Sequence, residues 1–508
     1  MSNVPYISMK EITKTFGKVV ANNNINLELY SGEVHALLGE NGAGKSTLMN
    51  ILSGIYVPDR GSIFVDGKEE KFSSPKDAIE FKIGMVHQHF KLVEVMTGLE
   101  NIMLGQKTSL FMNKNRIQKE IKDIVDRYGL DIDFNKCVYE MSVGEKQILE
   151  IIKVLYRGAK VLVLDEPTTV FTPQETKKLF KIMNKMREQG CAVIFISHKM
   201  DEVMEIADSI TVLRKGETVT TLKKQETSPE NLAELMVGHA VDLSIERTKV
   251  ESGQNVLEVK NLSVYDESGI ETIKKLSFNI KSGEILGVAG IVNSGQKELC
   301  EAIFGMHKVK EGEILFEGEN LLGKSTREII KKGISMSFIP EDRLGMGLVG
   351  SMDMVDNIML KEYHLQKGLF INKKPAAAKA KEIVKQLKVK TPGIHYPVKN
   401  LSGGNIQKIL LGRELASNPK LLIMAYPVRG LDVNTCYTIY NLINEQKAKG
   451  VGVLFIGEDL DVLIQLCDRI AVINRGEITG TVDAAGTSKE ELGLLMMGHK
   501  NKVQQEVV

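Results

Sequence analysis

Short runs of apolar, β-branched residues alternate along the chain with segments whose apolar positions recur every three or four residues. The apolar runs predict buried strands at residues 34–38, 161–164 and 192–196. Residues 116–128 predict a helix, whose apolar face consists of Ile117, Ile121, Ile124, Val125 and Tyr128. This alternation is typical of an α/β domain with a largely parallel sheet, and in such a domain the loops at the strand ends carry the chemistry.

The whole pattern occurs twice. The tripeptide SGE at 31–33 returns at 282–284, LFMNK at 110–114 returns as LFINK at 369–373, and LMVGH at 235–239 returns as LMMGH at 495–499. The nearly constant spacing indicates one fold present in two copies. We therefore expect domains at residues 1–240 and 256–500, a polar linker at 241–255 and a polar tail at 501–508.

The amino-acid composition is that of a folded globular protein and argues against several other classes. The 508 residues are 43% hydrophobic and 26% charged, which is ordinary for a folded globular protein. The net charge of +1 argues against a general nucleic-acid or membrane-surface binder. No apolar run approaches the roughly 20 residues that span a bilayer, and the first residues lack the order of a signal peptide. The five scattered cysteines cannot all pair, which favours a reducing cytoplasmic setting.

A glycine-rich loop follows the first predicted strand and precedes a helical segment. Its glycines let backbone N–H groups turn toward phosphate oxygens, and the helix N-terminus adds partial positive charge. The lysine would then supply a point charge to the β- and γ-phosphates, and the serine hydroxyl would bind Mg²⁺. The motif consists of Gly39, Glu40, Asn41, Gly42, Ala43, Gly44, Lys45, Ser46 and Thr47.

Polar residues end the other two predicted strands. Asp165 and Glu166 follow 161–164, where Asp165 fits a partner of Mg²⁺ and Glu166 fits a base that polarises the attacking water. A solvated strand end is the alternative interpretation of such a pair. His198, after 192–196, could sense a γ-phosphate, although a lone histidine is usually structural. The phosphate loop upstream favours the functional interpretation of all three.

A signature motif completes the set. It occurs as LSGGNIQ at 401–407 and in a degraded form, MSVGEKQ, at 141–147. With it, nearly the whole chain resembles ABC-type ATPases. The resemblance implies two tandem P-loop NTPase domains, each with a mostly parallel α/β sheet core and a helical subdomain, that use ATP and Mg²⁺.

The resemblance also implies individual roles. Gln88 would be the Q-loop residue, which joins Mg²⁺ to the membrane partner and acts in catalysis with Glu166 and His198. Mg²⁺ would be held by Ser46, Gln88 and Asp165. Phe16 would stack on adenine, with a place in the core as its alternative role. The signature residues that would bind ATP are Ser402, Gly403 and Gly404.

The second copy has lost the catalytic positions. Lys45 corresponds to Gln296 and Ser46 to Lys297, while Asp165, Glu166, Gln88 and His198 correspond to Ala425, Tyr426, Glu341 and Glu458. Lys297 comes one helical position late and should point about 100° away from the loop. If the halves pack head to tail as in the resembled family, the intact loop would share one catalytic site with the intact signature, and the two degraded motifs would share the other.

The partners follow from the resemblance alone. Tandem ATPases with a degenerate second half resemble importers of simple sugars and nucleosides, and the variant motifs favour the nucleoside branch. Two membrane permeases and an extracellular substrate-binding lipoprotein are the expected partners. The chain would then lie at the cytoplasmic face of the membrane, would contact it only through the permeases and would bind no nucleic acid. A ribose-like sugar is the alternative cargo, and a soluble ribosome-associated protein is a remote alternative that the short linker disfavours.

Overall fold

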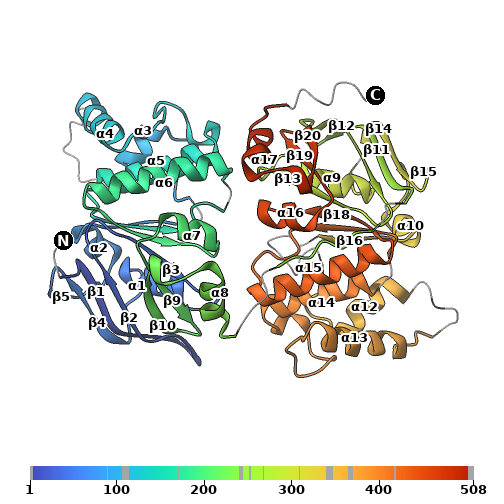
Figure 1. The fold of residues 1–508 in the computed structure, drawn as a ribbon, viewed down its shortest axis with the longest axis horizontal. Coiled ribbons are helices and arrows are strands. Elements are labelled where there is room, and N and C mark those ends of the chain that lie inside the picture. The colour runs from blue at the N-terminus through green and yellow to red at the C-terminus, as the bar shows by residue number, and fades with distance from the viewer. Residues whose placement is uncertain are drawn as a thin grey trace. The chain divides into compact units, whose positions relative to one another are not determined.

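The computed structural model describes residues 4–87, 90–105, 114–169, 171–239, 244–250, 253–266, 268–307, 309–338, 347–363, 366, 370–416 and 419–500. The chain divides into two compact units, Met1–Asp242 and Leu243–Val508. In Figure 1 the first unit runs from blue to green, and the second continues through yellow to red.

A six-stranded sheet forms the centre of unit 1. The five strands from β9 to β6 are parallel, and β10 pairs antiparallel to β9 at one edge. The three strands that the sequence predicts are β3, β7 and β8, and all three are confirmed. Their continuous apolar sequences suit a sheet buried on both faces. The strand order is β10 (Glu217–Lys223), β9 (Ser209–Arg214), β3 (Val34–Leu38), β8 (Ala192–Ile196), β7 (Val161–Asp165) and β6 (Ile83–Val86).

A second, antiparallel sheet in unit 1 was not predicted from the sequence. Its register shifts several times between β1 and β2, and Glu11 and Asn24 take positive φ near these shifts. Such irregularities break the two-residue alternation by which a half-buried strand is recognised. The order is β2 (Val19–Leu29), β1 (Ile7–Phe16), β4 (Arg60–Val65) and β5 (Lys68–Glu70).

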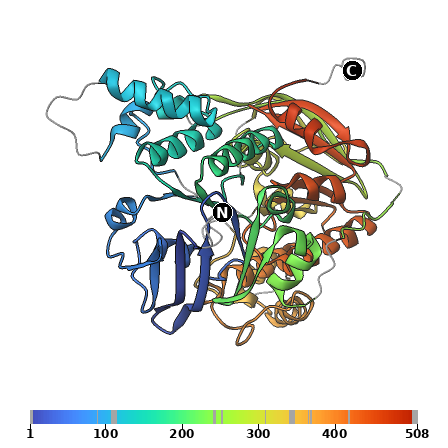
Figure 2. The ribbon, with the colours of Figure 1, turned by 60° about the vertical axis from the view of Figure 1, so that its left-hand side comes forward.

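The helices of unit 1 cover the six-stranded sheet and also form a separate helical part. Helices α3, α4 and α5 pack together, and in Figures 1 and 2 they lie at the opposite end of the unit from the antiparallel sheet. The predicted helix is α4, with Ile121 and Tyr128 buried as expected. The helices are α1 (Lys45–Leu52), α2 (Pro75–Glu80), α3 (Gly98–Met103), α4 (Lys114–Tyr128), α5 (Val143–Tyr156), α6 (Pro173–Glu188), α7 (Met200–Ile206) and α8 (Pro229–Val237).

Unit 2 repeats this architecture. Its sheets have the orders β12-β11-β14-β15 and β16-β17-β18-β13-β19-β20, and α13 packs against both α12 and α14. The strands are β11 (Asn255–Tyr265), β12 (Glu271–Lys281), β13 (Ile285–Gly290), β14 (Val309–Phe316), β15 (Glu319–Asn320), β16 (Ile334–Phe338), β17 (Leu421–Ala425), β18 (Gly452–Ile456), β19 (Arg469–Asn474) and β20 (Glu477–Asp483). The helices are α9 (Gln296–Ile303), α10 (Thr326–Lys331), α12 (Met354–Glu362), α13 (Lys374–Gln386), α14 (Gly403–Leu415), α15 (Val433–Ala448), α16 (Leu460–Leu466) and α17 (Lys489–Met496).

Both units thus have the predicted mostly parallel sheet and helical part. Across the described residues, we find no helix whose length and hydropathy would let it cross a membrane.

Candidate functional site

The phosphate loop joins the carboxyl end of β3 to the first turn of α1. Gly39, Gly42 and Gly44 have φ values of 155°, 84° and 99°. At Gly44 a Cβ atom would lie 2.4 Å from the carbonyl oxygen of Ala21 in β2, so only glycine fits there. At Gly42 a Cβ atom would meet open space. The loop therefore packs closely against β2 at Gly44 and is open at Gly42, as a site that binds an anion through backbone N–H groups requires.

Lys45 lies inside this loop with only 8% of its surface exposed. Its Nζ donates hydrogen bonds to the carbonyl oxygens of Gly39 (2.6 Å) and Glu40 (3.1 Å). Burial lowers the pKa of the lysine, while the negative charges of Glu166 and Asp165 act in the opposite direction. The ammonium group is thus held at the loop, within electrostatic reach of both carboxylates at the end of β7.

Glu166 is positioned by an unusual backbone conformation. Its φ of 47° is rare for a residue with a side chain, and its N–H donates to the carbonyl oxygen of Ile196 at the end of β8 (3.0 Å). The carboxylate Oε1 then lies 3.2 Å from Nδ1 of His198, just beyond the same strand. This contact lowers the pKa of Glu166 and keeps it ionised. The structure therefore brings together the predicted residues of two separate strand ends.

Asp165 has a different environment from its neighbour. Burial and the charge of Glu166 raise the pKa of Asp165 from 3.8 to about 6. A divalent cation would offset both effects, so a partly buried carboxylate of this kind suits Mg²⁺. Among the described residues no cluster of three or more His, Cys, Asp or Glu forms a complete metal site. Asp165 and the exposed Ser46 could supply two ligands, and nucleotide phosphates and water the remainder.

Asn22 is a site residue that the sequence interpretation missed. It is fully buried on β2, and its Nδ2 donates to the carbonyl oxygen of Gly44 (3.1 Å). Its Oδ1 has no hydrogen-bond partner among the described residues. The available signal was a polar residue at a buried strand position, but the irregular register of β2 hid it. Asn22 fixes the last turn of the loop before α1.

The structure places the remaining predicted site residues as follows. Phe16 ends β1 with 44% of its surface exposed and meets Tyr56 edge-to-face at 5.3 Å between ring centroids, which excludes the core alternative. Gln88 lies outside the described residues. Ser402, Gly403 and Gly404 lie in unit 2, whereas the remaining predicted site residues belong to unit 1.

The two signature motifs begin helices with different caps. At α5, Ser142 Oγ accepts from the N–H of Glu145 (3.2 Å), and the Glu145 carboxylate accepts from the N–H of Ser142 (2.6 Å). At α14, Ser402 Oγ instead accepts from the side-chain amide of Asn405 (2.8 Å) and, within the described residues, caps no backbone N–H. The Ser142 hydroxyl thus caps one N–H in the first turn of α5, whereas within the described residues the Ser402 hydroxyl caps none in the first turn of α14.

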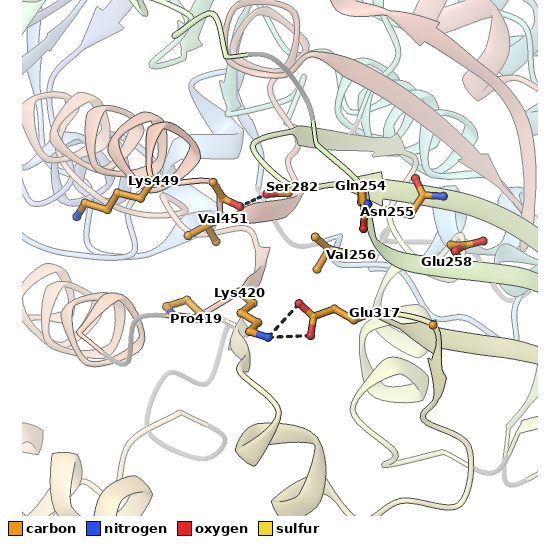
Figure 3. A pocket seen from close by; sticks show the side chains of 12 residues that line it. Gln254, Asn255, Val256, Glu258, Ser282, Glu317, Pro419, Lys420, Lys449 and Val451 are labelled. Carbon is orange, nitrogen blue, oxygen red and sulfur yellow. Dashed lines mark hydrogen bonds and ion pairs between the residues drawn. The ribbon is translucent and has the colours of Figure 1, made fainter.

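One cavity of unit 2 does not belong to this chemistry. It has a volume of about 710 Å³, and in Figure 3 the side chains of Lys420 and Glu317 point toward each other within it, 2.8 Å apart. Its lining residues Ser282, Lys420 and Val451 lie just before β13, β17 and β18. The cavity is therefore at the amino ends of the parallel strands, whereas the second phosphate loop follows the carboxyl end of β13.

A phosphate loop, an acidic strand end and a following histidine on one mostly parallel sheet are features of phosphate-loop ATPases. A model of the ABC transporter family matches residues 22–169 and 273–428. The nucleoside import ATP-binding protein NupA of Lactococcus lactis subsp. cremoris is 42% identical over 98% of this chain and 99% of its own. The guanosine import ATP-binding protein NupO of Bacillus subtilis is 43% identical over 98% of both chains, and the ribose import ATP-binding protein RbsA of Clostridium tetani is 37% identical over 96% of both.

The chain belongs to the ABC transporter family, in which it is a transport ATPase built from two tandem domains. This membership confirms the resemblance that the signature motifs indicated.

Proposed function

We propose that the chain hydrolyses ATP to power the import of nucleosides. The observation that carries the cargo assignment is its identity of 42% and 43%, over nearly full length, to importers of nucleosides and of guanosine. A ribose-like sugar is the second candidate, supported by the 37% identity to a ribose import protein. The cluster of Lys45, Asp165, Glu166 and His198 supports the chemistry.

The proposed mechanism assigns one task to each residue of unit 1. The loop from Gly39 to Thr47 cradles the phosphates, and Lys45 leaves its two carbonyl partners to meet the β- and γ-phosphates. Mg²⁺, when bound, neutralises phosphate charge, and Ser46, Gln88 and Asp165 would hold it.

Glu166 would orient and deprotonate the attacking water. His198 keeps this carboxylate ionised and aims it through the 3.2 Å contact. Phe16, whose ring is exposed, would stack on adenine. We further propose that Ser402, Gly403 and Gly404 complete this catalytic site, because the first turn of α14 has N–H groups suited to the γ-phosphate.

The proposed partners are two membrane permeases and an extracellular substrate-binding lipoprotein, with the chain at the cytoplasmic face. Purified chain should be reconstituted in proteoliposomes with two membrane permeases and a substrate-binding lipoprotein from the organism that encodes it. ATP-dependent uptake of radiolabelled guanosine, with little uptake of ribose, supports the proposal. Uptake of ribose alone would favour the sugar importer, and hydrolysis that responds to ribosomes but not to permeases would favour the remote alternative.

A further inference from the structure

The second phosphate loop has kept the backbone path of the first. Gly295, like Gly44, is left-handed at the position before the helix, with φ of 110°. Asn293 takes a φ of 67° where the first loop has Gly42. Helix α9 begins at Gln296 just as α1 begins at Lys45. The loss of the lysine has therefore not collapsed the loop, and the two loops differ in what fills them.

Gln296 fills the second loop. Only 3% of its surface is exposed, and its Nε2 donates to the carbonyl oxygen of Ile291 (3.0 Å), the position equivalent to Glu40. Its Oε1 accepts from the backbone N–H of Ser294 (3.0 Å). The amide also lies against the loop backbone, since a Cβ on Gly290 would be 2.7 Å from Nε2.

The difference from Lys45 is one of hydrogen-bond direction. An ammonium group donates only, so Lys45 binds the carbonyl oxygens of Gly39 and Glu40 and accepts from no loop N–H group. A primary amide both donates and accepts, so Gln296 binds the loop on two sides and also accepts from the N–H of Ser294. That N–H bonds in addition to the carbonyl oxygen of Ile291 (3.2 Å), as the N–H of Ala43 in the first loop bonds to that of Glu40 (3.0 Å). To admit a phosphate, the amide would lose both hydrogen bonds and would bring no positive charge in exchange.

The described cations near the loop do not take the place of Lys45: Arg429, beside Tyr426, lies 3.8 Å from the carboxylate of Glu458. Lys297, the neighbouring position, is exposed and lies 3.8 Å from Glu301, which confirms that it points away from the loop. Tyr426 occupies the place of Glu166 with the same left-handed backbone, φ 52°. Burial and the charge of Glu458 raise its pKa, so it remains an uncharged phenol.

We propose that Gln296 is an internal ligand of the second phosphate loop, which it keeps closed, so that the chain binds nucleoside triphosphate at Lys45 and not in unit 2. This inference rests on the proposed function only for the binding of ATP in unit 1. Loss of nucleotide binding in unit 2 is a different property from loss of catalysis there, because a site without catalytic residues can still bind a nucleotide.

The test is photolabelling of the full chain with Mg²⁺ and 8-azido-ATP, followed by proteolysis and mass spectrometry to assign the label to each unit. In the wild type the label should lie in unit 1. Gln296→Lys should raise the labelling of unit 2 by about tenfold or more, because it removes the acceptor and restores the charge. Lys297→Ala, which changes an exposed neighbour, is the matched control and should leave both units as in the wild type.

Equal labelling of both units in the wild type would overturn the proposal. So would a Gln296→Lys chain with the wild-type melting temperature and no increase in unit 2. If the lysine variant is unstable, Gln296→Ala removes the same two hydrogen bonds, and a smaller increase is then expected. A wild type without label in unit 1 would contradict the proposed function alone, because Gln296→Lys still reports on unit 2.

Discussion

At the scale of single residues, the candidate site depends on a contact between two strand ends. Glu166 and His198 are 32 residues apart, and the left-handed backbone of Glu166 turns its carboxylate toward the imidazole. Such a conformation costs of the order of 1–3 kcal/mol, and strained residues of this kind concentrate at functional sites. Tyr426 has the same left-handed backbone at the equivalent position of unit 2, so both copies of the fold contain this strained residue. The two units differ in the side chain there, which is a carboxylate only in unit 1.

Glu166→Gln should separate binding from hydrolysis. The amide preserves the shape of the side chain but cannot accept a proton, so hydrolysis should fall by about 10²–10⁴-fold while ATP binding remains. Phosphate release from the assembled transporter and equilibrium binding of labelled ATP measure the two quantities. The matched control is Tyr426→Phe in unit 2, which should change hydrolysis little. Substantial hydrolysis in Glu166→Gln would show that another group acts as the base.

Asp165 should make the nucleotide-free protein less stable as the pH rises. Because its pKa is raised from 3.8 to about 6 on folding, the folded state retains a proton that the unfolded state has lost. The stabilisation is complete below pH 4 and is lost as the pH passes 6, by up to about 3 kcal/mol. Mg²⁺ with nucleotide should restore it.

Asp165→Asn should therefore melt at a higher temperature than the wild type at pH 7.5 without ligand, and this advantage should shrink toward pH 5. Thermal unfolding followed by circular dichroism over this range measures the effect. Asp123→Asn, on the exposed side of α4, is the control and should show no such pH dependence. A difference between Asp165→Asn and wild type that does not change with pH would contradict the assigned pKa.

At the scale of elements, the starts of α5 and α14 have different caps although they occupy equivalent places in the repeat. Gly403→Val copies the residue that α5 carries at Val143. The added side chain should hinder approach of the γ-phosphate to the first turn and lower hydrolysis by about tenfold or more.

The converse change, Val143→Gly, should leave hydrolysis near the wild-type rate, because the proposed catalytic site uses the signature of α14 and not that of α5. Both rates are measured as phosphate release from the transporter. Equal losses in the two variants would mean that both signatures act in catalysis. Glu145→Ala should instead lower stability by about 1 kcal/mol, since it removes a helix cap.

At the scale of the whole molecule, part of the interval between the repeats is anchored to unit 2. Ile245 is buried in a core cluster that includes residues of α15 and α16, and Asn444 donates a hydrogen bond to the carbonyl oxygen of Glu246 (3.1 Å). Arg247 donates to the carbonyl oxygens of Ile464 and Gln465, at the last turn of α16. Guanidinium groups at this end of a helix satisfy carbonyls that have no partner within the helix.

Ile245→Ala should destabilise unit 2 by about 2 kcal/mol or more, because it opens a cavity in the core that includes α16. Hydrogen exchange measured by mass spectrometry should show faster exchange in α15 and α16 than in the wild type, and unchanged exchange in unit 1. Lys249→Ala, at an exposed position of the same segment, is the control. Wild-type exchange in Ile245→Ala would show that the segment is not part of the core.

The repeat, the central strands, α4 and the loop–helix motif around Lys45 can all be predicted from the amino-acid sequence. These features are local: a buried parallel strand is a continuous apolar run, and a phosphate loop needs its glycines and lysine at fixed spacing. The sequence also located the losses at Gln296 and Tyr426, because two copies of one fold can be compared position by position.

The contacts that these residues make follow from the folded chain and not from the sequence pattern. The irregular antiparallel sheets, the hydrogen bond of Asn22 to the loop and the contact of Glu166 with His198 join residues that are distant in the chain. Hydrogen bonds and pKa values depend on distance and burial, which no local pattern encodes. A sequence shows that glutamine replaces lysine at 296. That the glutamine amide both donates and accepts within the loop follows from the folded backbone, which places Ile291 and Ser294 around it.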